Sequence, residues 1–230
     1  QLGEYYGMIS HLDEQVGRVL AALNKSGHAE NTIVVYTADH GLAVGSHGLL
    51  GKQNLYEHSM GTPMVITGPG IPRGKSSDAL VYLYDLFPTI CSWADVEVPG
   101  KVEGRSLAGV INGDRPLVRK TLFTAYEDKM RAVRDDRYKL IRYPLINHTQ
   151  LFDLRGDPDE LKNLAGEPGQ AGRVEQMMSL LQTWQRQTGD KTPHTSKNPK
   201  SMVIDLTGRK RKPDRHQPEW IIRKYFGDGK

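Results

Sequence analysis

The sequence contains one cysteine and no long apolar run. Cys91 is the single cysteine among 230 residues, so neither an internal disulfide nor a multi-cysteine metal site can hold the fold together. No stretch approaches the roughly 18 consecutive apolar residues of a membrane-spanning helix. The sequence also lacks an initiator methionine and a basic-then-apolar signal segment, and it begins inside a helical pattern. We expect a globular chain without a membrane span that is part of a longer protein.

Positive charge is concentrated at the end of the sequence. Residues 191–230 contain eleven Lys and Arg against four Asp and Glu, a local charge of +7, whereas residues 1–190 carry −3. Such a tail suits either a solvated extension or a segment that binds nucleic acid or another polyanion. No aromatic residues interleave with the cluster Arg209–Lys212, as stacking on bases requires. We therefore favour a solvated extension and expect no nucleic-acid partner.

The first half of the chain alternates helical and strand patterns. Apolar residues recur every three or four positions over residues 2–23, which predicts a core-packing helix that ends near Gly27. Residues 32–37 are β-branched and apolar without alternation, as expected of a parallel strand covered on both faces. Residues 63–67 predict a second buried strand, and residues 85–94 predict a short helix. This order is typical of an α/β fold.

Beyond about residue 115 the pattern changes to short segments separated by turns. Four of them predict an antiparallel meander: Thr121–Tyr126, Arg131–Arg134, Tyr138–Tyr143 and Gln150–Leu154. Apolar residues at helical spacing between Val174 and Trp184 predict a helix that covers one face of this sheet. We divide the chain into residues 1–115, 116–188 and 189–230.

Candidate ligand-binding residues follow the first predicted strand. Asp39 and His40 lie directly after it, where ligands bind in open α/β sheets, although Asp close to Gly is also common turn chemistry. A glycine-rich loop follows over residues 41–51; it contains His47 and leads to Lys52. A carboxylate and an imidazole beside a lysine suggest a tetrahedral oxyanion such as sulfate or phosphate, whose charge a metal and the ammonium group share.

Short motifs spread over about residues 5–165 resemble, in order and spacing, the type I sulfatases of the alkaline phosphatase superfamily. They are Leu12–Asp13, Val16–Gly17, Thr37–Gly41, Gly45–Lys52, Tyr56–Glu57, Thr62–Ile66, Asp85–Thr89, Arg131–Arg134, Tyr138–Ile141, Leu151–Leu154, Asp157–Pro158, Glu160 and Asn163–Leu164. The resemblance implies an α/β fold: the carboxyl-terminal part of an alkaline-phosphatase-like α/β/α sandwich, followed by a small antiparallel sheet packed with a helix. Residues 1–115 then belong to the catalytic domain, residues 116–188 to the carboxyl-terminal subdomain, and residues 189–230 form a basic extension.

The resemblance also implies roles for four residues. Asp39 matches a ligand of the active-site divalent cation, usually calcium. His40 occupies a position beside that metal, but imidazole is a poor calcium ligand, so contact with the nucleophile or the sulfate stays open as its role. Lys52 matches the lysine that neutralises a sulfate oxygen. For His47, a hydrogen bond that braces the loop and a substrate contact are both open.

Two features of the family are missing or changed. The nucleophile, a formylglycine made from Cys or Ser in a Cys/Ser-x-Pro/Ala-x-Arg motif, has no counterpart here, nor has the paired-Asp metal site that precedes it. Cys91 lies in Ile-Cys-Ser-Trp and fits a buried helix position. Gly61 stands where many members carry Arg. We therefore expect the formylglycine in an amino-terminal part outside this chain, and no turnover by the chain alone.

The leading hypothesis is a sulfuric ester hydrolase that acts on a sugar, aryl or other sulfate ester. The alternatives are a phosphonate or phosphodiester hydrolase of the same superfamily, and a noncatalytic polyanion-binding module, which only the charged tail supports. Family resemblance favours a periplasmic or secreted location. The predicted buried strands lack covering elements within the chain, so we expect a homo-oligomer or association with the missing amino-terminal part.

Overall fold

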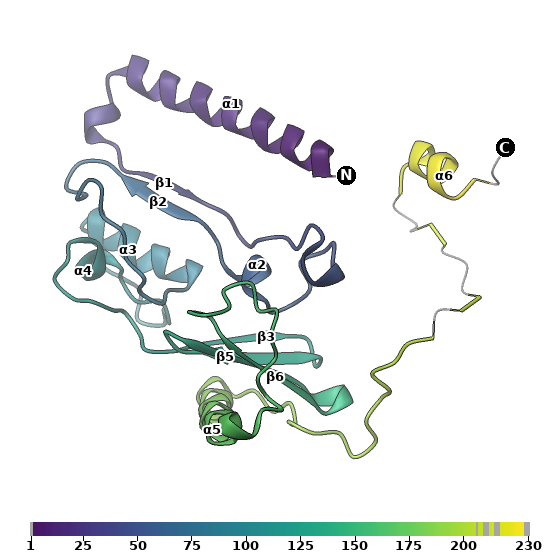
Figure 1. The fold of residues 1–230 in the computed structure, drawn as a ribbon. Helices are drawn as coiled ribbons and strands as arrows, with labels where there is room; N and C mark the ends of the chain where they lie inside the picture. The colour runs from purple at the N-terminus through teal and green to yellow at the C-terminus, as the bar shows by residue number, and fades with distance from the viewer. Residues whose placement is uncertain (1, 206, 209–211, 214–216, 228–230) are drawn as a thin grey trace. The chain divides into compact units, whose positions relative to one another are not determined.

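The computed structural model describes residues 2–205, 207–208, 212–213 and 217–227, which divide into two units, 1–199 and 200–230 (Figure 1). The second unit contains one short helix, α6 (Glu219–Tyr225). All other helices and strands described below belong to the first unit. In the part of the chain that the structure describes, no helix has both the length and the apolar character needed to cross a membrane.

The chain opens with a long helix, α1 (Leu2–Ser26), as the apolar spacing predicts. The expectation that this helix packs into a core is wrong for this structure, because none of the residues of α1 is buried. Leu12 and Val19, which both belong to the apolar stripe, are 54% and 68% exposed. The spacing of the apolar residues predicts a helix with one apolar face, but it does not show which segment, if any, covers that face.

Two strands follow, β1 (Val34–Thr37) and β2 (Met64–Thr67), and they form a two-stranded sheet. They pair antiparallel, with Val34 opposite Thr67, so the prediction of a parallel strand covered on both faces is wrong here. Tyr36 and Val65 are both exposed. Their β-branched, apolar composition indicated strands correctly. Composition does not show whether a strand pairs parallel or antiparallel with its neighbour.

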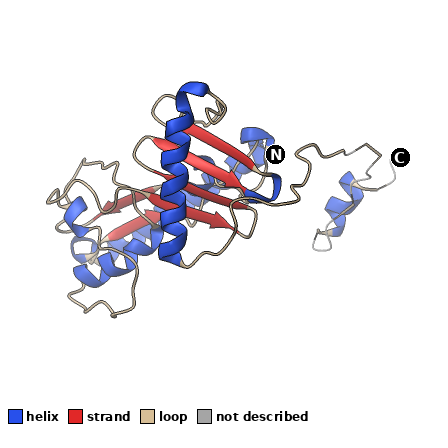
Figure 2. Ribbon diagram, turned by 90° about the horizontal axis from the view of Figure 1, so that it is seen from below, coloured by secondary structure: helices blue, strands red, loops and turns tan. Residues whose placement is uncertain are grey.

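The second sheet is the antiparallel meander that the sequence predicts. Its strands run in the order β3 (Leu122–Tyr126), β4 (Met130–Arg134), β5 (Tyr138–Tyr143) and β6 (His148–Asp153). The helix α5 (Ala171–Thr188) lies across one face of this sheet (Figure 2). The helix that the apolar spacing between Val174 and Trp184 predicts is therefore present and lies where expected.

Strand β5 is buried on both faces, and the segment after Lys52 covers one of them. Leu140 and Ile141 are neighbours in the strand, both have no exposed surface, and they point to opposite faces. Leu140 belongs to a core cluster with Met177 and Leu181 of α5. Ile141 belongs to another cluster with Leu55 and Tyr56, which follow Lys52. The sheet thus lies between α5 and the loop that carries the candidate site.

Short helices connect these parts. They are α2 (Glu57–Met60), α3 (Leu86–Trp93) and α4 (Ala108–Ile111), together with 3-10 turns at Ala29–Asn31, Ser46–Gly48, Leu83–Asp85, Pro144–Ile146 and Pro168–Gln170. Cys91 is buried in α3, as its context predicts. The fully buried Asp85 just before α3 accepts hydrogen bonds from the guanidinium of Arg119 and from the backbone N–H of Tyr82 and Arg105.

Residues 190–196, which we call the strap, follow α5 and are bound to the same sheet. The Arg131 guanidinium on β4 donates to Asp190 at 2.6 Å, and that of Arg142 on β5 donates to the carbonyl of His194 at 2.7 Å. The side-chain amide of Asn147 exchanges two hydrogen bonds of 2.9 Å with the backbone of Ser196. This part of the sequence-predicted extension therefore belongs with the first unit.

The Arg131–Asp190 pair predicts a pH-dependent contribution to stability. Hydrogen bonding to Arg131 holds the pKa of the Asp190 carboxyl below its usual range. We expect Asp190→Asn to lower the free energy of unfolding by roughly 2 to 4 kcal/mol at neutral pH, because it removes one partner of a largely buried pair. A depressed folded-state pKa stabilises the fold above the unfolded value of about 4, so the difference from wild type should shrink as the pH falls below that value. Urea unfolding across pH measures both effects.

The matched control is Asp136→Asn, whose partner Arg155 and whose own side chain are both mostly exposed. That variant should change stability little at any pH. Equal effects of the two substitutions would contradict a role for the strap in holding the sheet.

Candidate active site

Three of the four residues singled out in the sequence meet at the end of β1. His40 Nε2 lies 2.5 Å from Lys52 Nζ and 3.2 Å from Asp39 Oδ2. His40 is partly buried, whereas the Asp39 side chain is 80% exposed. The structure therefore brings a carboxylate, an imidazole and an ammonium group together, although Lys52 is twelve residues beyond His40 in the chain.

The other ring nitrogen of His40 fixes how the imidazole can act. His40 Nδ1 lies 2.8 Å from the carbonyl oxygen of Gly41, which can only accept a hydrogen bond, so the hydrogen of a neutral ring belongs on Nδ1. Nε2 then has a lone pair that accepts from the Lys52 ammonium. In this arrangement His40 orients Lys52, and its roles toward a metal, a nucleophile or a sulfate stay predictions.

Gly41 allows the turn after His40 to pass close to α2. A Cβ atom at Gly41 would lie 2.0 Å from the carbonyl oxygen of His58, and the Gly41 N–H donates to the carbonyl of Ser59 at 2.9 Å. No side chain fits at that distance. The glycine that the sequence placed beside the candidate ligands is therefore required by packing against residues 58–61.

His47 makes a different set of contacts. Its ring stacks on Tyr56 with centroids 4.0 Å apart, and its Nε2 lies 3.0 Å from the carbonyl oxygen of Asp159. No contact described for it joins His47 to Asp39, His40 or Lys52. The geometry matches the loop-bracing alternative for His47, because the hydrogen bond connects the glycine-rich loop to a residue 112 positions away in the chain.

The described residues do not form a complete metal site by themselves. Among the described residues, no cluster of three or more His, Cys, Asp and Glu could hold a metal ion. The exposed carboxylate of Asp39 is a hard oxygen ligand that suits calcium, but calcium takes about six to eight oxygen ligands. Asp39, with His40 beside it, would suit such a site as one contributor among several ligands, and this role stays a prediction.

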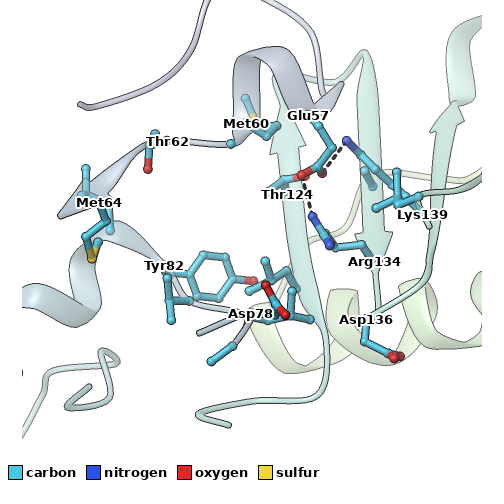
Figure 3. Close-up of a pocket in the computed structure, with 18 of the residues that line it drawn as sticks. Glu57, Met60, Thr62, Met64, Asp78, Tyr82, Thr124, Arg134, Asp136 and Lys139 are labelled. Carbon is cyan, nitrogen blue, oxygen red and sulfur yellow. Dashed lines mark hydrogen bonds and ion pairs between the residues drawn. The ribbon is translucent and has the colours of Figure 1, made fainter. Parts of the chain in front are cut away.

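A charge network around Glu57 was not found by sequence reasoning. Lys139 on β5 is 2% exposed and lies 3.0 Å from Glu57 Oε1 and 2.9 Å from Glu160 Oε1. The guanidinium of Arg134 donates to Glu57 Oε2 at 2.5 Å (Figure 3). The available signal was a lysine inside the apolar strand Tyr138–Tyr143, since a lysine is almost never fully buried without a partner.

A cavity of about 850 Å³ opens beside this network (Figure 3). Its lining includes Asp39 at the end of β1, Glu57 on α2, Tyr82 and Arg134. The predicted metal ligand and the charge network thus border the same space.

Comparison with known proteins places this geometry in a family. The model of the carboxyl-terminal region of N-sulphoglucosamine sulphohydrolase matches residues 45–187, more than half of the chain. The chain belongs to the sulfatase family. The match covers the region from the glycine-rich loop to α5, so it includes Lys52, His47 and the whole second sheet.

Curated and solved sulfatases agree with this assignment. The N-acetylglucosamine-6-O-sulfatase of Bacteroides thetaiotaomicron is 33% identical over 203 residues, which are 83% of this chain and 36% of that protein. A solved protein in complex with its substrate D-glucosamine-2-N,6-O-disulfate has a TM-score of 0.74 at 32% identity, over 81% of this chain and 40% of that one. The phosphonate monoester hydrolase of Agrobacterium radiobacter has a TM-score of 0.71 at 27% identity, over 82% and 42%.

These comparisons confirm the alkaline-phosphatase-like fold and the assignment to its carboxyl-terminal portion. The sulfatase chain spans about two fifths of the length of the relatives it matches. The boundary near residue 115 and the roles of Asp39, His40, His47 and Lys52 stay predictions.

The close approach at Gly41 predicts a strong effect of adding one methyl group. Gly41→Ala should destabilise the loop that carries Lys52, because its Cβ would overlap the carbonyl of His58. Gly17→Ala in α1 is the matched control: nothing lies within 4 Å of that Cβ, and alanine in a helix should stabilise the protein by about 0.5 to 1 kcal/mol. Thermal unfolding of the two variants should shift in opposite directions. A Gly41→Ala variant as stable as wild type would rule out this packing.

Proposed function

We propose that this sulfatase chain forms the carboxyl-terminal part of a sulfuric ester hydrolase and supplies its sulfate-binding lysine and part of its metal site. The observation that carries the proposal is the meeting of Asp39, His40 and Lys52 at the end of β1 in a chain of the sulfatase family. A carboxylate that can hold a metal cation, placed beside an ammonium group, suits the binding of a tetrahedral oxyanion, because the two positive charges together offset the charge of the anion.

In this proposal the residues of the chain act on charge and orientation. The Lys52 ammonium faces a sulfate oxygen and stabilises the negative charge that develops as the ester bond breaks. His40 Nε2 accepts from Lys52 and holds it in that direction. Asp39 would hold a divalent metal, most suitably calcium, which when bound offsets further charge on the sulfate. The formylglycine nucleophile is expected from an amino-terminal part outside this chain, so the chain alone should not turn over substrate.

The substrate class rests on the relatives. Several of those at 30% identity or more are named as sulfatases, among them a choline-sulfatase and a hexuronate-2-O-sulfatase. Phosphonate monoester hydrolases match in structure at 27% and 28% identity, so phosphonate or phosphodiester hydrolysis is the second candidate. A noncatalytic polyanion-binding role has only the +7 charge of residues 191–230 in its favour.

Turnover of matched esters tests the function. A protein that contains this chain with its complete catalytic domain should hydrolyse an aryl sulfate faster than the corresponding aryl phosphate. Lys52→Ala should lower its kcat/KM by roughly 100-fold or more, because an ammonium that faces the charge developing in the transition state contributes several kcal/mol. The 230-residue chain alone should show no turnover.

Lys129→Ala provides the control for a lost positive charge, since Lys129 is exposed and pairs with Glu127 in the turn between β3 and β4. This variant should keep normal efficiency. Preference for the phosphate ester would favour the second candidate, and near-normal efficiency of Lys52→Ala with an unchanged Tm would remove Lys52 from the mechanism.

The exposed apolar surface predicts association. The stripe of α1 is uncovered, Tyr36 and Val65 are exposed on the two-stranded sheet, and Phe87 and Ile90 of α3 are each 51% exposed. Contiguous apolar surface and open strand edges favour pairing with another chain. We expect the isolated chain to sediment as a homo-oligomer at micromolar concentration, or to bind the amino-terminal part of its protein. A compact monomer that unfolds cooperatively would contradict this expectation.

A further inference from the structure

The turn at residues 157–160 lies between β6 and α5 and has an unusually constrained backbone. The Asp157 carboxylate accepts hydrogen bonds from the N–H groups of Leu161 and Lys162, at 3.0 and 2.8 Å. Glu160 has a φ of +57°, which non-glycine residues rarely adopt, and its N–H donates to the carbonyl of Asp157 at 3.1 Å. Strain of this kind persists where surrounding contacts fix the conformation.

Two adjacent residues of this turn hold the loop that carries Lys52. The carbonyl oxygen of Asp159 lies 3.0 Å from His47 Nε2, and Glu160 Oε2 accepts from the backbone N–H of Glu57 at 2.5 Å. His47 and Glu57 lie five residues before and five residues after Lys52 in the sequence. The turn therefore contacts both ends of an eleven-residue segment with Lys52 at its centre.

The contact of Glu160 is buried and charge-balanced. Glu160 is 2% exposed, and Lys139 bridges it to Glu57. Burial raises the pKa of the Glu160 carboxyl, whereas the Lys139 ammonium and the N–H of Glu57 act in the opposite direction. A buried carboxylate with these partners fixes direction and distance more tightly than an exposed one, because breaking the contact would leave charges unpaired.

The part of this segment around Lys52 has little packing of its own. All residues of Gly48–Gln53 are exposed, and the backbone of His47 and Gly48 is left-handed. Burial resumes two residues after Lys52, at Asn54–Tyr56. Lys52 thus lies in the exposed part of the segment, and its position depends on the contacts that hold the rest of it: the buried residues Asn54–Tyr56, His40 and the two contacts with the turn.

We infer that Glu160, together with the backbone carbonyl of Asp159, is a positioning element for Lys52, through which the carboxyl-terminal sheet sets the geometry of the sulfate-binding loop. The inference rests on the proposed function for the catalytic role of Lys52. The contacts at both ends of the Lys52 segment are independent of that role. Glu160 touches neither Lys52 nor substrate in this scheme, and it acts through Glu57 and Lys139.

Hydrogen exchange on the 230-residue chain tests the clamp without any requirement for turnover. Three loop amides report on the segment: those of Ala43, Gly45 and Leu49, which donate to Gly51, Leu49 and Ser46. Glu160→Ala should raise their exchange rates at least tenfold relative to amides in β5 and β6, because the loop loses one of the two contacts by which the turn holds it. Glu160→Gln, which keeps an acceptor for the Glu57 N–H, should give a smaller increase and covers the case in which Glu160→Ala does not fold.

A core variant separates positioning from general destabilisation. Leu181→Ala removes a fully buried side chain on the α5 face of the sheet, away from the loop, and should raise exchange across the sheet without a selective effect on the three loop amides. Glu127→Gln, at an exposed ion pair, should change neither. Unchanged loop exchange in both Glu160 variants would overturn the inference, as would an equal selective effect of Leu181→Ala.

Kinetics of the protein with its complete catalytic domain supply the second readout. Glu160→Gln should lower kcat for sulfate ester hydrolysis about tenfold with little change in KM, because a displaced lysine loses contact mainly with the transition state. Loss of stability alone would not produce that split. If the wild-type protein hydrolyses no sulfate ester, the proposed function fails, and the exchange result still decides whether the clamp exists. Selective loop exchange with an unchanged kcat would overturn the positioning role.

Discussion

Two pairs of like charges face each other across the ladder between β4 and β5, and the organisation of this sulfatase chain depends on how they are neutralised. Arg134 lies opposite Lys139, and Arg131 lies opposite Arg142. Directly opposed like charges destabilise a sheet unless anionic or carbonyl oxygens come between them. Glu57 and Glu160 supply those oxygens on the loop face, whereas Asp190 and the carbonyl of His194 supply them on the α5 face.

This constraint connects segments that are distant in sequence. The carboxylate of Glu57 reaches Arg134 and Lys139 across about 80 positions, and it lies immediately after the loop that carries Lys52. The apolar residues Leu55 and Tyr56 pack on Ile141 at the same place. Apolar contact holds the loop near the sheet without direction, and the charged hydrogen bonds then select one arrangement of it.

Local patterns in the sequence predicted a large part of this structure. The meander, α5 and the burial of Cys91 follow from alternation, helical spacing and turn residues, all of which act over short distances. The order of motifs identified the family, and the strand–loop pattern placed Asp39, His40 and Lys52 near one another. The antiparallel pairing of β1 with β2 and the exposure of α1 were missed because they depend on which distant segment lies alongside, and composition carries no record of that.

The Glu57 network was missed for a related reason. The types of its four residues can be read from the sequence, but their pairing cannot. The contact of Lys139 with Glu160 depends on a turn in which the backbone of Glu160 is left-handed, and no residue propensity predicts that conformation. The role of His47 shows the same limit. The residue type allowed both a brace and a substrate contact, and only its distance to the Asp159 carbonyl gives the bracing geometry.

The strap also determines where this protein can be divided for study. The end of α5 at Thr188 looks like a natural terminus for expression, since the regular secondary structure of the first unit stops there. A chain cut at that point would lose Asp190, His194 and Ser196, and the guanidinium groups of Arg131 and Arg142 would lose the acceptors that the strap supplies. A division after Pro199 keeps every one of these partners, and it separates the compact body from most of the basic residues of the tail.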